Sequence, residues 1–238
     1  FKEINHAFFN KLGGKSVGIY KSLNCGLRSL DKKKDVHKNL KIIRKKIKSN
    51  SNKIILLSQT HSNKFFYIDK KSKIKNKKFE GDALITNKKS MPIGILTADC
   101  VPILLYDKKN KMIAAIHAGW KGAYKGITQK VIKFMIKKGC TTKNITAAIG
   151  PCITFKNYEI KQDFIKKFIK KNKNNSIFFK KIGNKNFFSL NKYIYSQLNS
   201  LDIKKIDNIN KDTFNIKNNF FSARRSISLN ENDYGRNI

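Results

Sequence analysis

The chain has 238 residues, with 52 Lys and Arg against 15 Asp and Glu and a formal net charge of +37. Hydrophobic residues make up 40% of it and aromatic residues 11%, which is enough for a core and argues against a disordered chain. No run reaches the roughly 18 uncharged apolar residues that a membrane-spanning helix needs, so we expect no membrane partner.

The first part of the chain predicts one helix and two short strands. Apolar residues recur at helical spacing within residues 35–48, where Asp35 is well placed as a cap or as an acid in the first turn. Short apolar runs at residues 53–58 and 64–69 predict strands. The Lys- and Asn-rich residues 70–78 are typical of an exposed loop or a helix end.

The middle of the chain is its most apolar part and predicts three strands in succession. These strands cover residues 92–97, 101–106 and 112–117. The polar residues 107–111 between the last two runs predict a hairpin turn.

The remainder predicts further helices and strands. An amphipathic helix ends at Gly139, and residues 144–149 form a buried strand after it. Residues 155–215 predict two Lys-rich helices around a strand at 177–181, and residues 166–175 are typical of a loop or helix end.

Strands and helices thus alternate without an internal repeat or a Pro-, Gly- or Ser-rich linker. We therefore expect one domain over residues 1–238, of the α/β or α+β class, built as an αβ sandwich. Its mixed sheet should carry the three central runs.

The basic charge has the composition of a solvated surface. Only five of the basic residues are Arg, whereas Lys, Ile and Asn together supply 107 residues, a bias typical of an AT-rich coding sequence. Proteins that read nucleic acid favour Arg for bidentate contacts, and residues 80–117 carry a net charge of only +1. We expect the charge to be spread over the surface, without a continuous groove or a specific nucleic-acid partner. A basic nucleic-acid-binding module without activity is a rival that a salt titration of binding tests.

The cysteines indicate a reducing environment. The four cysteines are scattered and form no CxxC pair, which excludes a classical zinc finger and a disulfide scaffold. The N-terminus has no secretory apolar segment. We therefore expect a reduced, cytoplasmic protein.

Three reactive side chains stand at the ends of predicted apolar strands, namely His61, Cys100 and His117. Two imidazoles and a thiolate are suitable ligands for a zinc ion that keeps a fourth position open. Because 38 and 16 residues separate them, only the fold can bring them together, and we predict that they converge at one rim of the sheet. The other two histidines, His6 and His37, are interpreted as structural.

Other interpretations of the same residues stay open. A buried Cys is often a small apolar residue, and a His after a strand is often hydrogen-bonded in a core. A metal-free cysteine hydrolase, with Cys100 as nucleophile and His117 as base, fits the same spacing. A copper oxidase does not, because four histidines are too few for a multicopper centre.

Motifs along the whole chain resemble one known family. They are GDALIT at 81–86, TADCVP at 97–102, HAGWKG at 117–122, IGPCI at 149–153, FFSARR at 220–225 and, outside these, Tyr158-Glu159. In this order they resemble the YfiH-like or laccase-domain family, also called purine nucleoside phosphorylases of the multicopper-polyphenol-oxidase type.

The resemblance implies a zinc enzyme in which His61, Cys100 and His117 are metal ligands and catalytic residues. It implies cleavage of adenosine, inosine, guanosine and methylthioadenosine with phosphate, and deamination of adenosine. The products of phosphorolysis are the free base and ribose 1-phosphate or methylthioribose 1-phosphate. The chain departs from the family at Lys11 and Lys121, where many relatives have Arg, and a lysine ammonium does not offer the bidentate phosphate contact of a guanidinium.

Further candidate substrate contacts have two interpretations each. The basic candidates for phosphate are Lys11, Lys121, Arg224 and Arg225, of which the last two also fit a solvated pair near the C-terminus. Gln59 fits either a substrate contact or a hydrogen bond at a strand end. Asp82 and Asp99 fit a contact to the base, an orienting bond to a ligating His or, for Asp82, a turn. The sequence predicts neither the preferred nucleoside nor the oligomeric state.

Overall fold

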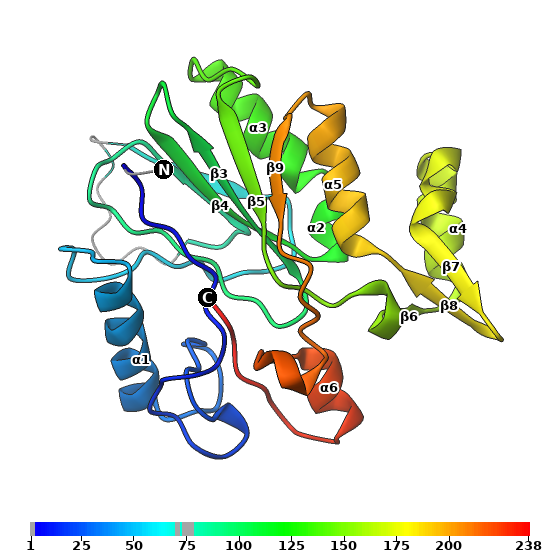
Figure 1. The fold of residues 1–238 in the computed structure, drawn as a ribbon, viewed down its shortest axis with the longest axis horizontal. Helices are drawn as coiled ribbons and strands as arrows, with labels where there is room; N and C mark the ends of the chain where they lie inside the picture. Colours follow the sequence, from blue (N-terminus) through cyan, green and yellow to red (C-terminus); the bar gives the residue numbers. More distant parts are fainter. Residues whose placement is uncertain (1–2, 70–71, 73–78) are drawn as a thin grey trace.

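A six-stranded mixed sheet forms the centre of the structure (Figure 1), a computed structural model that describes residues 3–69, 72 and 79–238. The strand order is β1-β2-β4-β3-β5-β9. The outer pairs β1–β2 and β5–β9 are parallel, and the inner pairs are antiparallel. The strands are β1 (Phe65–Ile68), β2 (Ala83–Thr86), β3 (Val101–Asp107), β4 (Met112–Ala118), β5 (Ile145–Ile149) and β9 (Lys205–Asn208).

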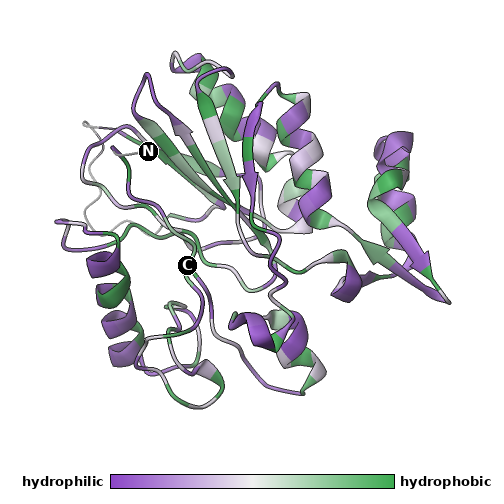
Figure 2. Ribbon diagram, in the orientation of Figure 1, coloured by the Kyte–Doolittle hydropathy of each residue, from purple (hydrophilic) through white to green (hydrophobic). Residues whose placement is uncertain are grey.

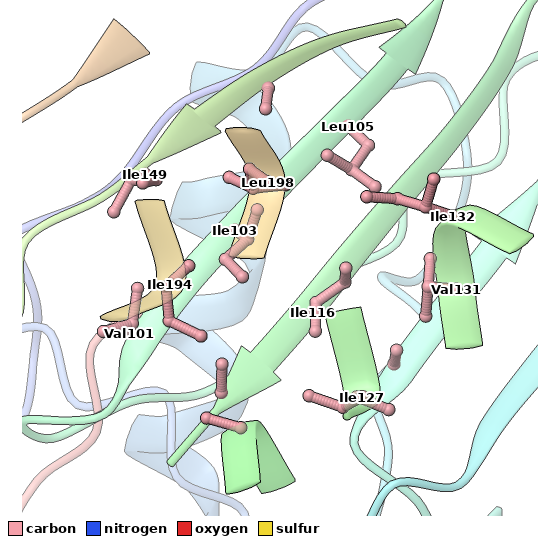
Figure 3. Packing of buried hydrophobic residues seen from close by; sticks show 14 of the residues in the cluster. Val101, Ile103, Leu105, Ile116, Ile127, Val131, Ile132, Ile149, Ile194 and Leu198 are labelled. Atoms are coloured by element: carbon pink, nitrogen blue, oxygen red, sulfur yellow. The ribbon is translucent and has the colours of Figure 1, made fainter. Parts of the chain in front are cut away.

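Three helices lie on one face of this sheet. They are α2 (Trp120–Tyr124), α3 (Ile127–Lys137) and α5 (Leu190–Ser200). Ile127, Val131 and Ile132 of α3 pack with Ile194 and Leu198 of α5 on the apolar side chains of β3 and β4 (Figure 3). All of these side chains are buried, so the amphipathic pattern of α3 is explained by one face against the sheet. As predicted, the helix stops at Gly139, which adopts φ +91°.

The opposite face is covered by the N-terminal third of the chain. The helix α1 (Lys33–Lys46) matches the predicted helix, with Asp35 in its first turn. Ile43 and Phe9 line a small apolar cavity together with Leu104 and Ala115 of the sheet. Figure 2 shows the resulting pattern, with apolar residues concentrated on the central strands and polar residues on the outer turns. The fold is thus the predicted mixed-sheet αβ sandwich.

A smaller sheet extends from the main body (Figure 1). It contains β6 (Glu159–Ile160), β7 (Phe179–Ile182) and β8 (Lys185–Phe188), and α4 (Gln162–Lys171) belongs to the same region. Phe168 of α4 stacks on Phe164 at 4.7 Å and meets Phe188 of β8 at 5.0 Å between ring centres. The remaining elements are α6 (Ala223–Ser228) and the 3-10 turns Gly18–Tyr20, Phe155–Asn157, Lys173–Phe178 and Ile216–Asn218.

Two predicted strands are wrong. Residues 53–58 and 92–97 form only isolated bridges, such as Ile55 to Ile93 and Thr97 to Asn237. Their backbone groups are bonded elsewhere: the Gln59 side chain donates to Leu96 O at 2.7 Å and accepts from Leu96 N at 2.7 Å. The apolar pattern reflects burial under the sheet, not membership of it.

The other predicted elements are confirmed, or their boundaries in the structure differ from the predicted ones by a few residues. The hairpin between β3 and β4 is confirmed, with Asn110 N donating to Asp107 Oδ1 at 2.6 Å. The strand expected at 177–181 begins only at Phe179 because residues 173–178 form a 3-10 turn. Residues 166–175 contain the end of α4, as predicted. Most of the loop expected at 70–78 lies outside the described residues.

No helix in the described part of the chain has the length and apolarity to cross a membrane.

Candidate metal centre

The ends of three neighbouring strands meet at one edge of the main sheet. Val101, the first residue of β3, pairs with Ala118, the last residue of β4, so Cys100 and His117 lie side by side. Ala83 at the start of β2 pairs with Ile116 of β4, which places Asp82 next to His117. His61 reaches the same edge from the loop that precedes β1, with φ +55°.

The three side chains converge as predicted, although His61 lies in the loop before β1 and does not follow a strand. Their ligand atoms all lie within 4.8 Å of one another, and Cys100 Sγ is 3.8 Å from His61 Nε2. The two imidazole rings are 4.8 Å apart at 75°. His117 is buried, Cys100 is half-buried and His61 is exposed, so the cluster is open to solvent on the His61 side.

The Asp82 carboxylate forms hydrogen bonds with the residues at this edge of the sheet. It is fully buried and accepts a hydrogen bond from His117 Nδ1 at 2.8 Å. It also accepts from the backbone N–H groups of His61 at 3.0 Å and Ser62 at 2.6 Å, and from Ser62 Oγ at 2.7 Å. Burial would raise the pKa of Asp82, but the hydrogen bonds from His117 and Ser62 outweigh it and lower the pKa to about 2.

The cluster changes the protonation of its own members. Burial would raise the pKa of the Cys100 thiol, but the adjacent His117 and His61 lower it to about 7. Burial would lower the pKa of His117, but the Cys100 sulfur and Asp82 raise it to about 9. A thiolate is therefore accessible near neutral pH, and thiolates are the metal-binding and nucleophilic form of cysteine.

Gly119 provides the space in which the cluster forms. A Cβ atom at this position would lie 2.8 Å from Cys100 Sγ and 2.8 Å from His61 Cδ2. Its φ of −70° is open to any residue, so the requirement for glycine here comes from close approach and not from the backbone conformation.

Other predicted contacts have protein partners. Gln59 is bonded at both ends of its amide to Leu96, as described above. The Arg225 guanidinium donates to the carbonyl oxygens of Thr213, Phe214 and Phe220 at 2.6–2.8 Å. Lys11 is half-buried with its Nζ 5.9 Å from the Phe221 ring centre, and burial lowers its pKa.

Asp99 and Arg224 join the cluster to the C-terminal helix α6. Asp99 has φ +89°, and its carboxylate accepts from Thr213 Oγ1 at 2.6 Å and Arg224 N at 2.7 Å. Burial raises the pKa of Asp99. The Arg224 guanidinium lies 5.5 Å from the Tyr158 ring centre and donates to Glu159 O at 3.2 Å. Lys121 is exposed, with its Nζ 5.7 Å from the Trp120 ring centre.

Tyr158 is a neighbour of the cluster that was not among the predicted site residues. It is half-buried, and it interacts electrostatically with Cys100, Asp99 and Arg224. Burial raises the pKa of Tyr158, so its phenol is neutral and can donate a hydrogen bond. The signal in the sequence was the Tyr158-Glu159 pair, which contributes to the family resemblance.

The three donors fit a zinc ion. Ligand atoms around a tetrahedral zinc lie about 3.5 Å apart, given bond lengths of about 2.0–2.3 Å, and the 3.8 Å between Cys100 and His61 is close to this. Because the carboxylate binds His117 Nδ1, Nε2 is the nitrogen that would face a metal ion, as is usual for metal-binding histidines.

The chain is thus an αβ protein whose mixed sheet carries a His–Cys–His cluster at one edge. The chain belongs to the family described as multi-copper polyphenol oxidoreductase laccase, whose model matches residues 5–238. The resemblance seen in the motifs is thereby confirmed.

Relatives and solved structures agree with this assignment. A Haemophilus influenzae protein named purine nucleoside phosphorylase is 31% identical over 224 residues, covering 92% of this chain and 88% of that protein. A Rickettsia prowazekii protein with the same name is 35% identical over 178 residues, covering 74% and 72%. The crystal structure of Bacillus licheniformis YfiH has a TM-score of 0.88 at 25% identity, covering 97% of this chain and 89% of that one. A Neisseria meningitidis protein has a TM-score of 0.84 at 26% identity, covering 97% and 90%.

Proposed function

We propose that this protein is a purine nucleoside phosphorylase that cleaves adenosine, inosine and guanosine with phosphate to the free base and ribose 1-phosphate. We include methylthioadenosine as a substrate and deamination of adenosine as a second activity. The observation that carries the proposal is the solvent-open cluster of His61, Cys100 and His117 in a chain whose relatives bear this name.

We propose zinc as the resident metal, held by Nε2 of His61, Sγ of Cys100 and Nε2 of His117. Zinc bound there would supply a Lewis acid, able to stabilise charge on phosphate oxygens or to acidify a water for deamination. Copper fits less well, because the chain has four histidines and the other two, His6 and His37, are exposed side chains outside the cluster.

Phosphorolysis requires that the protein hold phosphate at the ribose C1′ and stabilise the purine as it leaves. A phosphate oxygen forms a bond to the ribose C1′ while the bond from C1′ to the purine breaks, and the purine leaves with the electron pair and takes up a proton.

We propose that Arg224 holds the phosphate, because guanidinium groups bind phosphate oxygens in pairs. We propose that the neutral Tyr158 hydroxyl contacts the nucleoside beside Cys100. Lys11 is a weaker candidate for phosphate, because a lysine ammonium lacks the bidentate geometry of a guanidinium. Among the described residues, Gln59 and Arg225 already bond to backbone groups, which favours a role in shaping the site.

A second candidate is the metal-free cysteine hydrolase. The observation in its favour is the Cys100 thiol, whose pKa of about 7 results from the adjacent His117 and His61 despite burial. Such an enzyme would release base and free ribose without phosphate, and it would be active without zinc.

Product analysis with adenosine, with and without phosphate, tests the proposal. Adenine and ribose 1-phosphate that form only with phosphate would support phosphorolysis, and inosine would support deamination. Adenine formed without phosphate by a zinc-free preparation would support the hydrolase. Absence of turnover of adenosine, inosine and guanosine by zinc-loaded protein would contradict the proposed function.

We also propose a reducing, cytoplasmic location and small-molecule partners only. All four cysteines are free thiols, which is consistent with a reducing compartment. The substrates are purine nucleosides and phosphate, and we propose no specific nucleic-acid partner.

A further inference from the structure

One buried carboxylate forms hydrogen bonds with two of the three candidate ligand residues, with the side chain of His117 and with the backbone of His61. Asp82 Oδ1 accepts from His117 Nδ1 at 2.8 Å and from His61 N at 3.0 Å. Its Oδ2 accepts from Ser62 N at 2.6 Å and Ser62 Oγ at 2.7 Å, with Thr60 N at 3.4 Å. Asp82 is fully buried, so it reaches the ligands through hydrogen bonds inside the protein.

The sheet fixes where this carboxylate stands. Asp82 N donates to Lys64 O at 2.9 Å, and Asp82 O accepts from His117 N at 2.7 Å. Asp82 is thus held between the chain entering β1 and the end of β4. The loop before β1 that carries His61 depends on Asp82 in turn. His61 adopts φ +55°, a conformation that a residue other than glycine keeps only when its surroundings hold it.

We propose that Asp82 is the positioning residue that joins His61 and His117 into one preorganised metal-binding unit. It sets the Nε2 of His117 toward the cluster through the bond at Nδ1, and it holds the loop that presents His61. This inference rests on the proposed metal site, and it assigns Asp82 an action through the ligands instead of a contact with the substrate.

The pattern of hydrogen bonds explains why an acid is required. Both oxygens of Asp82 accept from N–H or O–H donors. In Asp82→Asn one oxygen becomes an NH₂ group, which places a donor against either the histidine side or the Ser62 side. With its oxygen toward the histidines the amide keeps the bonds to His117 Nδ1 and His61 N but turns its NH₂ group against Ser62 N. In the opposite orientation it keeps Ser62 and turns the NH₂ group against both histidines. Either way one side of the unit is lost, together with the negative charge beside His117, although the size and shape of the side chain are almost unchanged.

The test is metal affinity measured without any nucleoside. Zinc is titrated against a chelator of known affinity, and cobalt is added to the apo-protein so that its absorption reports the thiolate and imidazole ligands. For Asp82→Asn we expect affinity to fall by about 10- to 100-fold, with an altered cobalt spectrum. The matched control is Asp107→Asn, because Asp107 is equally buried but lies at the far end of β3, where it bonds to Asn110 and Thr141. It should keep the wild-type affinity and spectrum.

A second variant covers the case in which Asp82→Asn does not fold. Ser62→Ala removes one hydrogen bond from Oδ2 and leaves the carboxylate in place, and we expect a loss of affinity of a few-fold. The inference would be overturned if folded Asp82→Asn kept the affinity and the spectrum of the wild type. If Asp82→Asn is unfolded, the same result in Ser62→Ala would overturn it. Wild-type protein that binds no zinc would overturn it as well. Protein that binds zinc as expected but turns over no nucleoside would contradict the proposed function alone.

Discussion

At the scale of single residues, Cys100 lies between two imidazoles on a half-buried sheet edge. Its neighbours His117 and His61 offset the effect of burial on the pKa of the thiol. The other three cysteines are buried, and burial raises the pKa of each. Of the four thiols, that of Cys100 therefore forms a thiolate most readily near neutral pH.

Cys100→Ser should lower zinc content and phosphorolysis together, by about tenfold or more, with little change in melting temperature. A serine hydroxyl ionises poorly near neutral pH and is a harder ligand than thiolate, whereas the strands around it keep their apolar contacts. Zinc analysis, thermal unfolding and adenosine phosphorolysis on one preparation check this.

Cys140→Ser is the control, because Cys140 is buried away from the cluster. It should keep its zinc and lose no more than about 1–3 kcal/mol of stability as a buried hydroxyl, since Asp107 is a hydrogen-bond partner at this position. In Cys100→Ser, full activity with full zinc would end the assignment of Cys100 as a ligand, and lost activity with full zinc would favour a nucleophile.

Gly119→Ala should weaken metal binding by about tenfold or more, because its methyl group would lie 2.8 Å from both Cys100 Sγ and His61 Cδ2. The backbone conformation suits alanine, so the effect comes from contact alone. Chelator competition measures it. Gly183→Ala is the comparison: nothing lies within 4 Å of its Cβ, but its φ is +57°. It should lose some stability and no zinc affinity, and equal affinities in both variants would contradict the prediction.

At the scale of elements, polar side chains hold the helix α6 against neighbouring segments. Asp99 binds the first turn of α6 through Arg224 N, and Arg225 binds the carbonyl groups of the segment before it. Two adjacent arginines thus face different surroundings, since Arg225 is directed into the protein and Arg224 lies on the Tyr158 ring.

Arg225→Lys should therefore lower stability by roughly 1–3 kcal/mol, because lysine cannot reach all three carbonyl oxygens and leaves partly buried acceptors unpaired. Arg224→Lys should change stability by no more than about 0.5 kcal/mol while raising the phosphate concentration needed for half-maximal rate. Urea unfolding and phosphate-dependent kinetics on both variants separate the two roles. Equal stability of the two variants would contradict them.

At the scale of the whole molecule, the net charge of +37 acts against the folded state. The described ion pairs are few and mostly on the surface, so most lysines repel one another through solvent. This repulsion is screened by salt, whose Debye length is about 10 Å at 0.1 M.

The melting temperature should therefore rise by several degrees between about 0.02 and 0.3 M NaCl. Differential scanning fluorimetry measures it, and an uncharged osmolyte at equal osmolarity separates screening from preferential exclusion. A melting temperature that stays constant or falls with salt would show that self-repulsion is not a significant cost.

Binding to DNA should be weak and independent of base sequence. At about 0.15 M salt we expect dissociation constants no tighter than about 10⁻⁶ M for a duplex, with a steep loss as salt increases. Fluorescence anisotropy with two unrelated duplexes measures this. Submicromolar affinity for one of them at about 0.2 M salt would instead favour a dedicated nucleic-acid surface.

Local patterns in the sequence determined the elements whose partners are near in the chain. The helix α1, the hairpin between β3 and β4, and the amphipathic α3 with its stop at Gly139 all follow from periodicity and turn residues. His61, Cys100 and His117 were recognised from their types, because few side chains can bind a soft cation, and from their places beside apolar runs, of which the run before His61 is not a strand.

Only the tertiary structure decided which apolar runs entered the sheet and what supports the cluster. Residues 92–97 are apolar enough for a strand, yet β2 is the strand that pairs between β1 and β4. The hydrogen bonds of Asp82 to His117 and Ser62, and the close approach of Gly119 to Cys100, likewise join distant parts of the chain. Such contacts depend on three-dimensional register, which a pattern of neighbouring residues does not encode, because pairing between strands is set by burial and backbone bonding across the whole fold.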